Sequence, residues 1–193
     1  MKNKKLWITL GAIALVVILL ISTFVGKYNS LVDLDTQVEQ KAAVIETQLQ
    51  RRADLIPNFV ATVKGYAAHE EETYLAVTQA RNTLQQADSV GEQAAAGAAL
   101  DSAIDIWVNA VTENYPELKA NQNFIALQDE LAGTENRIAT ARNDYNEVVG
   151  TFNATIRKFP TNITAALFGF EKAEFFEADE GSQNAPTVDF SAE

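Results

Sequence analysis

The sequence predicts an all-α protein, in which an N-terminal transmembrane helix is followed by an elongated antiparallel bundle of about four long helices. Three observations lead to this prediction. An uncharged apolar run of 20 residues lies near the start of the chain. Apolar side chains then recur every three or four residues through most of the remaining chain. The last long segment carries a seven-residue repeat of large apolar side chains. These periods are typical of helices and not of strands, whose side chains alternate with a period of two.

Residues 6–25 are expected to cross a membrane as one helix. Their sequence, LWITLGAIALVVILLISTFV, contains no charged residue. At about 1.5 Å per residue it extends about 30 Å, the thickness of the hydrocarbon core of a bilayer. The alternative is a cleaved signal peptide, whose apolar region is usually shorter, at about 7–15 residues. Because residues 22–26 also make a poor cleavage site, we predict an uncleaved anchor that contacts the lipid bilayer.

The lysines around this run predict its orientation. Lys2, Lys4 and Lys5 precede it, whereas Lys27 alone follows it closely. Cytoplasmic flanks of membrane helices carry an excess of Lys and Arg. We therefore predict that residues 1–5 form a cytoplasmic N-terminus and that the rest of the chain after the span lies on the other side of the membrane.

The first helix beyond the membrane is predicted over residues 28–56, and it is expected to continue directly from the transmembrane helix. No Gly or Pro lies between Gly26, a flex point in this prediction, and Pro57. Pro57 lacks a backbone N–H and is expected to kink or restart the helix, with Asp54 as a candidate cap. The inward stripe has steps of three and four residues: Leu31, Leu34, Val38, Ala42, Ile45, Leu49, Ala53 and Ile56.

Three further segments complete the predicted bundle, which spans residues 27–176. A helical stripe continues from residue 58 to a break at residues 88–91, and an Ala-rich helix follows from residue 92 to about residue 114. The last long helix is expected over residues 121–159. Its coiled-coil-like heptad seam consists of side chains too large for a two-stranded zipper, and these favour the wider core of a bundle: Phe124, Leu131, Ile138, Tyr145, Phe152 and Phe159.

The C-terminal part of the chain contains an aromatic segment and an acidic tail. The aromatic segment, residues 161–176, either closes the end of the bundle or touches lipid as an interfacial helix. The nearby Glu171, Glu174 and Glu177 favour closure, because anionic lipid would repel them. Residues 177–193 have acidic residues and no basic ones, and they are predicted to be a disordered tail.

The composition excludes several classes of function. The chain has 15 basic and 26 acidic residues, a net charge of −11, one His and no Cys. The negative charge argues against nucleic-acid binding, which needs clustered positive charge. The absence of Cys removes disulfides, thiolate metal sites and thiol nucleophiles. The single His69 precedes Glu70, but a zinc-protease motif needs a second His four residues on, where Thr73 stands. We expect no enzyme activity, no metal and no cofactor.

A few polar residues are candidates for function. Arg51, Arg52 and Asp54 lie close together on the first helix, and Arg51 and Asp54 have the spacing of an intrahelical ion pair. Two interpretations are open. The arginines could dock an anionic group or a partner carboxylate, or they could belong to an ion-pair network that sets the register of the bundle. Arg81 and Arg142 occur in similar local sequences, and Glu135 could pair across helices with one of these arginines.

Several blocks of this sequence together resemble the LemA family of bacterial membrane-anchored helical proteins. The blocks are QLQRRADLIPN from residue 48, VKGYAAHE from residue 63, YPELKANQNF from residue 115, LQDELAGTENRIATARNDYN from residue 127 and RKFPTN from residue 157. The resemblance covers about residues 27–176 and leaves the acidic tail outside. It implies one N-terminal transmembrane helix followed by a soluble helical bundle, and it does not imply an enzyme activity.

These observations lead to one expected function and one alternative. We expect a non-enzymatic interaction or scaffold protein, anchored by a single pass in the bacterial inner (plasma) membrane, with its C-terminal domain periplasmic or extracellular. The partner proteins are not named by the sequence. The alternative is a homo-oligomer that assembles to organise or curve the membrane. The candidate interaction and hinge residues are Tyr28, Asn29, Arg51, Arg52, Asp54, Pro57, Asn58, Arg81 and Arg142.

Overall fold

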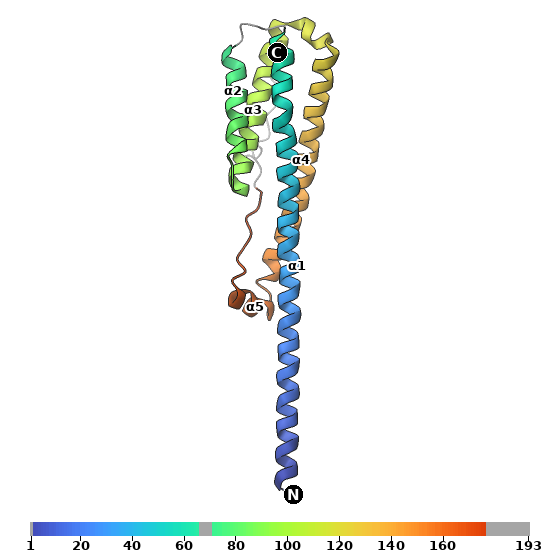
Figure 1. The fold of residues 1–193 in the computed structure, drawn as a ribbon, viewed down its shortest axis with the longest axis vertical. Helices are drawn as coiled ribbons and strands as arrows, with labels where there is room; N and C mark the ends of the chain where they lie inside the picture. Colours follow the sequence, from blue (N-terminus) through green and yellow to red (C-terminus); the bar gives the residue numbers. More distant parts are fainter. Residues whose placement is uncertain (1, 66–70, 177–193) are drawn as a thin grey trace, which may run out of the picture. The chain divides into compact units, whose positions relative to one another are not determined.

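The computed structural model describes residues 2–65 and 71–176, and within them the elements of regular structure are all helical (Figure 1). The predicted all-α fold and helical bundle are therefore confirmed. The predicted tail at residues 177–193 and the His69–Glu70 pair lie outside the described residues. The helices are α1 (Lys2–Lys64), α2 (Glu71–Gln85), α3 (Val90–Asn114), the short 3₁₀ helix η1 (Pro116–Ala120), α4 (Gln122–Thr155) and α5 (Thr161–Phe168).

The chain forms two compact units. Of the described residues, 2–41 and 147–173 belong to the first unit, and 42–65, 71–146 and 174–176 belong to the second. In the second unit the C-terminal part of α1, α2, α3 and the N-terminal part of α4 run alternately up and down (Figure 1). The predicted bundle of antiparallel helices is found here. Its aromatic core is built around Phe59, whose ring centroid lies 5.2 Å from that of Trp107 and 5.2 Å from that of Phe124.

Helix α1 begins at Lys2, before the apolar run, and continues without a break to Lys64. The sequence predicted this continuity from the apolar run as far as residue 56. Its N-terminal part is long and apolar enough to cross a membrane, with a mean hydropathy of 2.8 in an 18-residue window that is 0% buried. Large side chains such as Trp7, Ile8 and Ile18 are more than half exposed there. Further along, the predicted stripe is buried at Leu31, Val38, Ile45, Leu49, Ala53 and Ile56.

Pro57 was expected to kink or restart the helix, and the restart is wrong, because α1 runs through this position. Pro57 lies inside α1, on its exposed side. A proline at this position deprives the carbonyl of Ala53, four residues earlier, of its usual N–H donor. Arg81 of α2 supplies a replacement, because its Nε donates a hydrogen bond of 2.8 Å to the Ala53 carbonyl oxygen. The helix thus continues through Pro57 with a side chain in place of the missing backbone donor.

Replacing Arg81 by methionine is expected to destabilise the protein by about 1–3 kcal/mol, the usual cost of leaving a buried acceptor without a donor. A second substitution, Pro57→Ala, restores a backbone N–H beneath the same carbonyl. In the Arg81→Met background it should recover much of the loss. Denaturant unfolding of the full-length chain in mild detergent checks both expectations. Equal effects of Arg81→Met with and without Pro57→Ala would contradict the assigned role of Arg81.

Helix α4 buries most of the predicted heptad seam but ends earlier than expected. Phe124, Leu131, Ile138, Tyr145 and Phe152 are all buried, whereas Phe159 is 81% exposed. The reason is that α4 ends at Thr155, so Phe159 lies in the following turn and no longer follows the period of the helix.

Two asparagines of α4 hold the segment that follows α5. Gly169 ends α5 with a φ of 76°, in the left-handed region that favours glycine, and residues 170–176 have no regular structure. In the first unit the amide of Asn153 both donates to and accepts from the backbone of Ala173, at 2.9 Å each. In the second unit Asn146 makes the same pair of bonds with Phe176, at 2.9 and 2.8 Å.

Candidate functional site

The centre of the candidate site is a buried arginine. Arg52 of α1 is only 6% exposed because it lies beside the inward stripe, between the buried Leu49 and Ala53. Its guanidinium lies 2.6 Å from the carboxylate of Asp101 on α3 and also pairs with Glu135 of α4. A charge removed from water needs such partners. Three helices are therefore joined by one cation.

The neighbouring arginine has a different environment. Arg51 is exposed, and its guanidinium pairs with Glu130 at 2.7 Å; the same carboxylate oxygen accepts from Arg137 at 2.9 Å. The expected pair between Arg51 and Asp54 does not form, because Asp54 accepts from Gln50 at 2.8 Å instead. The structure contains an ion-pair network at these arginines, because each guanidinium group pairs with a carboxylate of this chain. Docking of a partner group stays a prediction.

Arg142 lies close enough to Asp101 for its charge to act on that carboxyl group, and its surroundings differ from those of Arg81. Its guanidinium carbon lies 4.7 Å from the ring centroid of Phe176, a cation–π geometry. A Cβ on the buried Gly97 would come within 3.3 Å of its terminal nitrogen. Glycine at position 97 therefore leaves room for Arg142 at the surface of α3. The similar local sequences around Arg81 and Arg142 do not place the two side chains in similar environments.

A cleft of about 490 Å³ opens beside Arg52. Among the described residues, the Nε of Arg52 has no hydrogen-bond partner. The described residues contain no group of three or more His, Asp or Glu side chains that could hold a metal ion. The charged side chains of Arg52, Asp101 and Glu135 line the cleft and offer hydrogen-bond donors and acceptors there. Its lining residues are Arg52, Asp101, Ile104, Asp105, Val108, Gln128, Leu131, Ala132 and Glu135.

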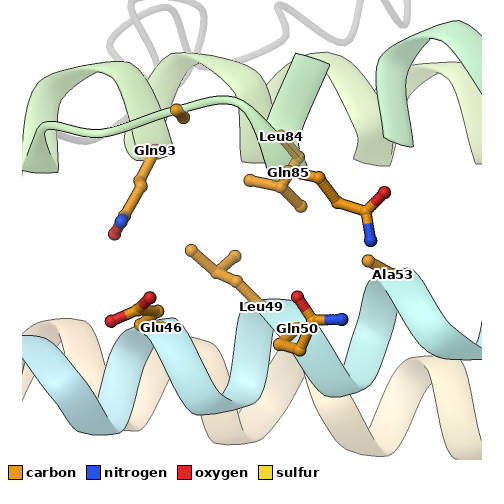
Figure 2. Close-up of a pocket in the computed structure, with 8 residues that line it drawn as sticks. Glu46, Leu49, Gln50, Ala53, Leu84, Gln85 and Gln93 are labelled. Atoms are coloured by element: carbon orange, nitrogen blue, oxygen red, sulfur yellow. The ribbon is translucent and has the colours of Figure 1, made fainter. Parts of the chain in front are cut away.

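A second and smaller pocket of about 70 Å³ lies between α1, α2 and the start of α3 (Figure 2). Leu49 and Leu84 face each other in the middle of the pocket, and the polar ends of Glu46 and Gln93 lie at one end of it (Figure 2). This volume is below that of typical ligand pockets, which measure about 300–1,000 Å³. We assign no ligand to it.

The pKa of Asp101 is raised to about 7. Burial is the largest cause, and the negative charge of Glu135 adds to it, whereas the positive charges of Arg52 and Arg142 act in the opposite direction. Two carboxylates thus compete for one buried guanidinium. Since the carboxyl group of Asp101 binds a proton more tightly in the folded chain than in the unfolded chain, its ionisation opposes folding.

The stability of the protein should therefore decrease as the pH rises from about 4 to about 7, as far as Asp101 contributes to it. Because its pKa is raised, Asp101 keeps its proton in the folded state between about pH 4 and pH 7, where the unfolded chain loses it. The stability that this proton contributes is lost once the pH passes the pKa of the folded state. The Asp101→Asn variant cannot ionise, so its stability relative to the wild type should increase from about pH 4 to about pH 7 and then level off. Urea unfolding at several pH values measures this. Asp105→Asn, at an exposed neighbour, is the matched control and should follow the wild type.

The nine residues predicted as candidates do not all come together. Tyr28 and Asn29 belong to the first compact unit, where Tyr28 packs against Phe168 with ring centroids 4.6 Å apart. The other seven belong to the second unit. There the backbone carbonyl oxygen of the exposed Asn58 accepts a hydrogen bond from the hydroxyl group of Thr62.

Sequence reasoning missed several residues of the site. Glu135 was expected to pair with Arg81 or Arg142, but it pairs with Arg52. Asp101 was not singled out, although a carboxylate next to the inward Leu100 in an Ala-rich helix was a usable signal. Outside this site, the contacts of Asn146 and Asn153 were also missed, because nothing in their local sequence indicates that backbone from beyond α5 lies beside them.

The chain has a helix with an exposed apolar start and a helical bundle with an internal ion-pair network. These two features define the class of the protein, which is a membrane-associated helical protein. The comparison with protein families agrees with this class. The LemA family matches residues 41–190 of the chain, which therefore belongs to the LemA family. The match includes most of the acidic tail, so the expectation that the tail lies outside the family pattern is wrong.

Individual relatives are moderately similar. The chain is 29% identical over 186 residues to the magnetosome protein MamQ 2 of Paramagnetospirillum magneticum, an alignment that covers 83% of this chain and 68% of the relative. It is 27% identical over 160 residues to protein LemA of Metamycoplasma hominis, covering 81% and 72%. It is 26% identical over 181 residues to the magnetosome protein MamQ of Magnetospirillum gryphiswaldense, covering 81% and 66%.

Proposed function

We propose that this protein is a non-enzymatic scaffold, held in the bacterial inner (plasma) membrane by a single pass, whose helical bundle binds other proteins. The observation that carries the proposal is the continuity of α1 from Lys2 to Lys64. One helix supplies both the exposed apolar run and core positions of the bundle such as Ile45 and Ile56. A scaffold needs such a continuous connection along the chain, because partners bound to the bundle then stay at the membrane.

The ion-pair network supports a scaffold rather than an enzyme. Arg52 joins α1, α3 and α4, and its charge is matched by Asp101 and Glu135 of the same chain. Catalytic groups are usually accessible to a substrate and placed beside a partner group that activates them. The most perturbed carboxyl group here, that of Asp101, lies within ion-pair distance of Arg52, which gives it a structural partner.

The topology in this proposal has the N-terminus in the cytoplasm. Alkaline phosphatase fused after Phe176 should be active in intact cells, and a fluorescent protein that matures only in the cytoplasm should be dark at the same position. Replacing Lys2, Lys4 and Lys5 by glutamine removes the charge asymmetry that the orientation rule uses, so a fraction of the chains should invert. The opposite reporter result for the wild type would overturn the topology.

The scaffold proposal is tested by photo-crosslinking in native membranes. A photoreactive residue is placed at Ile106, a 64% exposed apolar side chain next to Asp105 of the cleft, and separately at the exposed Asn58. A discrete adduct with a second protein, reproducible with the full-length chain, is expected from at least one position. If both positions give no adduct while the chain is folded and membrane-bound, the proposal fails.

The alternative, a self-assembling oligomer that organises or curves the membrane, has one observation against it. The heptad seam of α4 would be the natural contact between copies, but five of its six large side chains are buried within the chain. Adducts made only of this protein with itself, in the experiment above, would favour the oligomer over the scaffold. Imaging of membranes after overexpression would then show whether they change shape.

A further inference from the structure

Helix α5 buries polar side chains and exposes apolar ones, the reverse of a helix in a water-soluble protein. Its buried side chains are Thr161, Thr164 and Ala165, and the hydroxyl oxygen of Thr164 is buried with no hydrogen-bond partner in the described part of the chain. Its outer face, by contrast, carries Ile163, Ala166 and Leu167, all exposed; Leu167 is 71% exposed. Water-soluble helices bury their apolar stripe and expose their polar side chains. A helix with the opposite arrangement is matched to an apolar surrounding.

The contact of α5 with α1 places it close to the end of the apolar run. In the first unit the ring centroid of Tyr28 lies 4.6 Å from that of Phe168 and 6.0 Å from that of Phe170. Tyr28 is three residues beyond Val25, the last residue of the run, which corresponds to about 4.5 Å along the helix. The polar interface on each side of a bilayer is about 5–8 Å thick. A span ending near Val25 therefore places Tyr28 within that interface.

The charges around α5 fit the same location. In a chain with a net charge of −11, residues 156–170 contain Arg157 and Lys158 and no acidic residue. Phe159, directly after them, is 81% exposed. Basic side chains near an apolar surface are attracted to anionic lipid headgroups, and aromatic side chains are enriched at membrane interfaces. The glutamates that argued against lipid contact begin only at Glu171, after the helix has ended.

We propose that the outer face of α5, together with Phe159, lies in the headgroup region of the membrane that α1 spans. The proposal rests on the membrane anchoring proposed above and adds a second, shallow contact to it. Of the two alternatives that the sequence left open, this is the interfacial helix. Closure of the bundle falls to the segment beyond α5, where Phe176 is buried. The second contact would limit rotation and tilt of α1 in the bilayer.

The proposal can be tested with single cysteines, because the chain has no native Cys. Full-length variants Leu167→Cys and Ile163→Cys are labelled with a polarity-sensitive fluorophore. They are placed, at one chain per disc, in nanodiscs of phosphatidylcholine and phosphatidylglycerol, with and without a nitroxide on the upper acyl chain. Ile18→Cys, in the apolar run and 62% exposed, reports the anchor; Ile106→Cys, 64% exposed on α3, is the matched control for an exposed apolar position.

We expect blue-shifted emission and quenching by nitroxide lipid at positions 18, 163 and 167, and neither effect at position 106. Quenching at position 18 without quenching at positions 163 and 167 would overturn the α5 proposal and leave the anchor intact. A lack of quenching at position 18 would overturn the anchor itself. A blue shift at position 167 that arises only at several chains per disc, without quenching, would assign the surface to a second copy and also overturn the proposal.

Discussion

Replacing Arg52 by methionine is expected to lower the free energy of unfolding by about 3 kcal/mol, the lower end of the cost of removing one partner from a buried ion pair, because Asp101 and Glu135 are partly exposed. The substitution keeps the length and the apolar stem of the side chain, so the loss comes mainly from Asp101 and Glu135, which lose the guanidinium that pairs with them. Denaturant unfolding of the full-length chain in mild detergent, followed by circular dichroism, measures this loss.

Arg51 offers a matched control at the adjacent position. The Arg51→Met variant removes an exposed pair with Glu130, and exposed pairs contribute about 0–1 kcal/mol. Removing both acids together with Arg52, by Arg52→Met with Asp101→Asn and Glu135→Gln, should recover part of the loss, because no uncompensated charge is then left in the interior. Equal effects at positions 51 and 52 would contradict the assigned difference between the two arginines.

Replacing Phe59 by alanine is expected to cost about 3–5 kcal/mol, the typical range for a fully buried Phe. Phe59 is 0% exposed, and its ring contacts those of Trp107 and Phe124 from two other helices. Truncation leaves a cavity that the two remaining rings cannot fill. The fluorescence of Trp107 should also change, which gives a second readout besides the unfolding midpoint.

The control for Phe59 is the same substitution at Phe159, which is 81% exposed. In detergent, Phe159→Ala should change the free energy of unfolding by no more than about 0.5 kcal/mol, as surface substitutions usually do. A large loss at Phe159 or a small loss at Phe59 would show that the core does not lie where the structure places it.

Local sequence patterns were sufficient for most of the helical structure. The stripe from Leu31 to Ile56 and the seam from Phe124 to Phe152 are buried as their spacing indicated. The break before α3 is also where the sequence placed it, because Ser89 and Glu92 form a capping box at the N-terminus of that helix. Each of these features depends on residues within one or two helical turns of each other.

The candidate site was only partly predictable from the sequence. Arg52 was a candidate, but the sequence did not distinguish it from Arg51, since the two arginines differ only in which side of α1 they occupy. Nor did it indicate that Asp101, rather than another of the many acidic residues, would meet Arg52. Pairing across helices depends on the rotation and height of each helix, and local spacing contains neither.

By itself, the sequence determined the apolar run of α1, the unbroken helix between Gly26 and Pro57, and the faces that each long helix buries, because backbone preferences and hydrophobic periodicity act over a few residues. Only the tertiary structure decided how Pro57 is tolerated, which arginine is buried and which face of α5 is exposed. The donor to the Ala53 carbonyl, the partners of Arg52 and the aromatic contact of Phe168 come from distant parts of the chain, and packing alone brings them together.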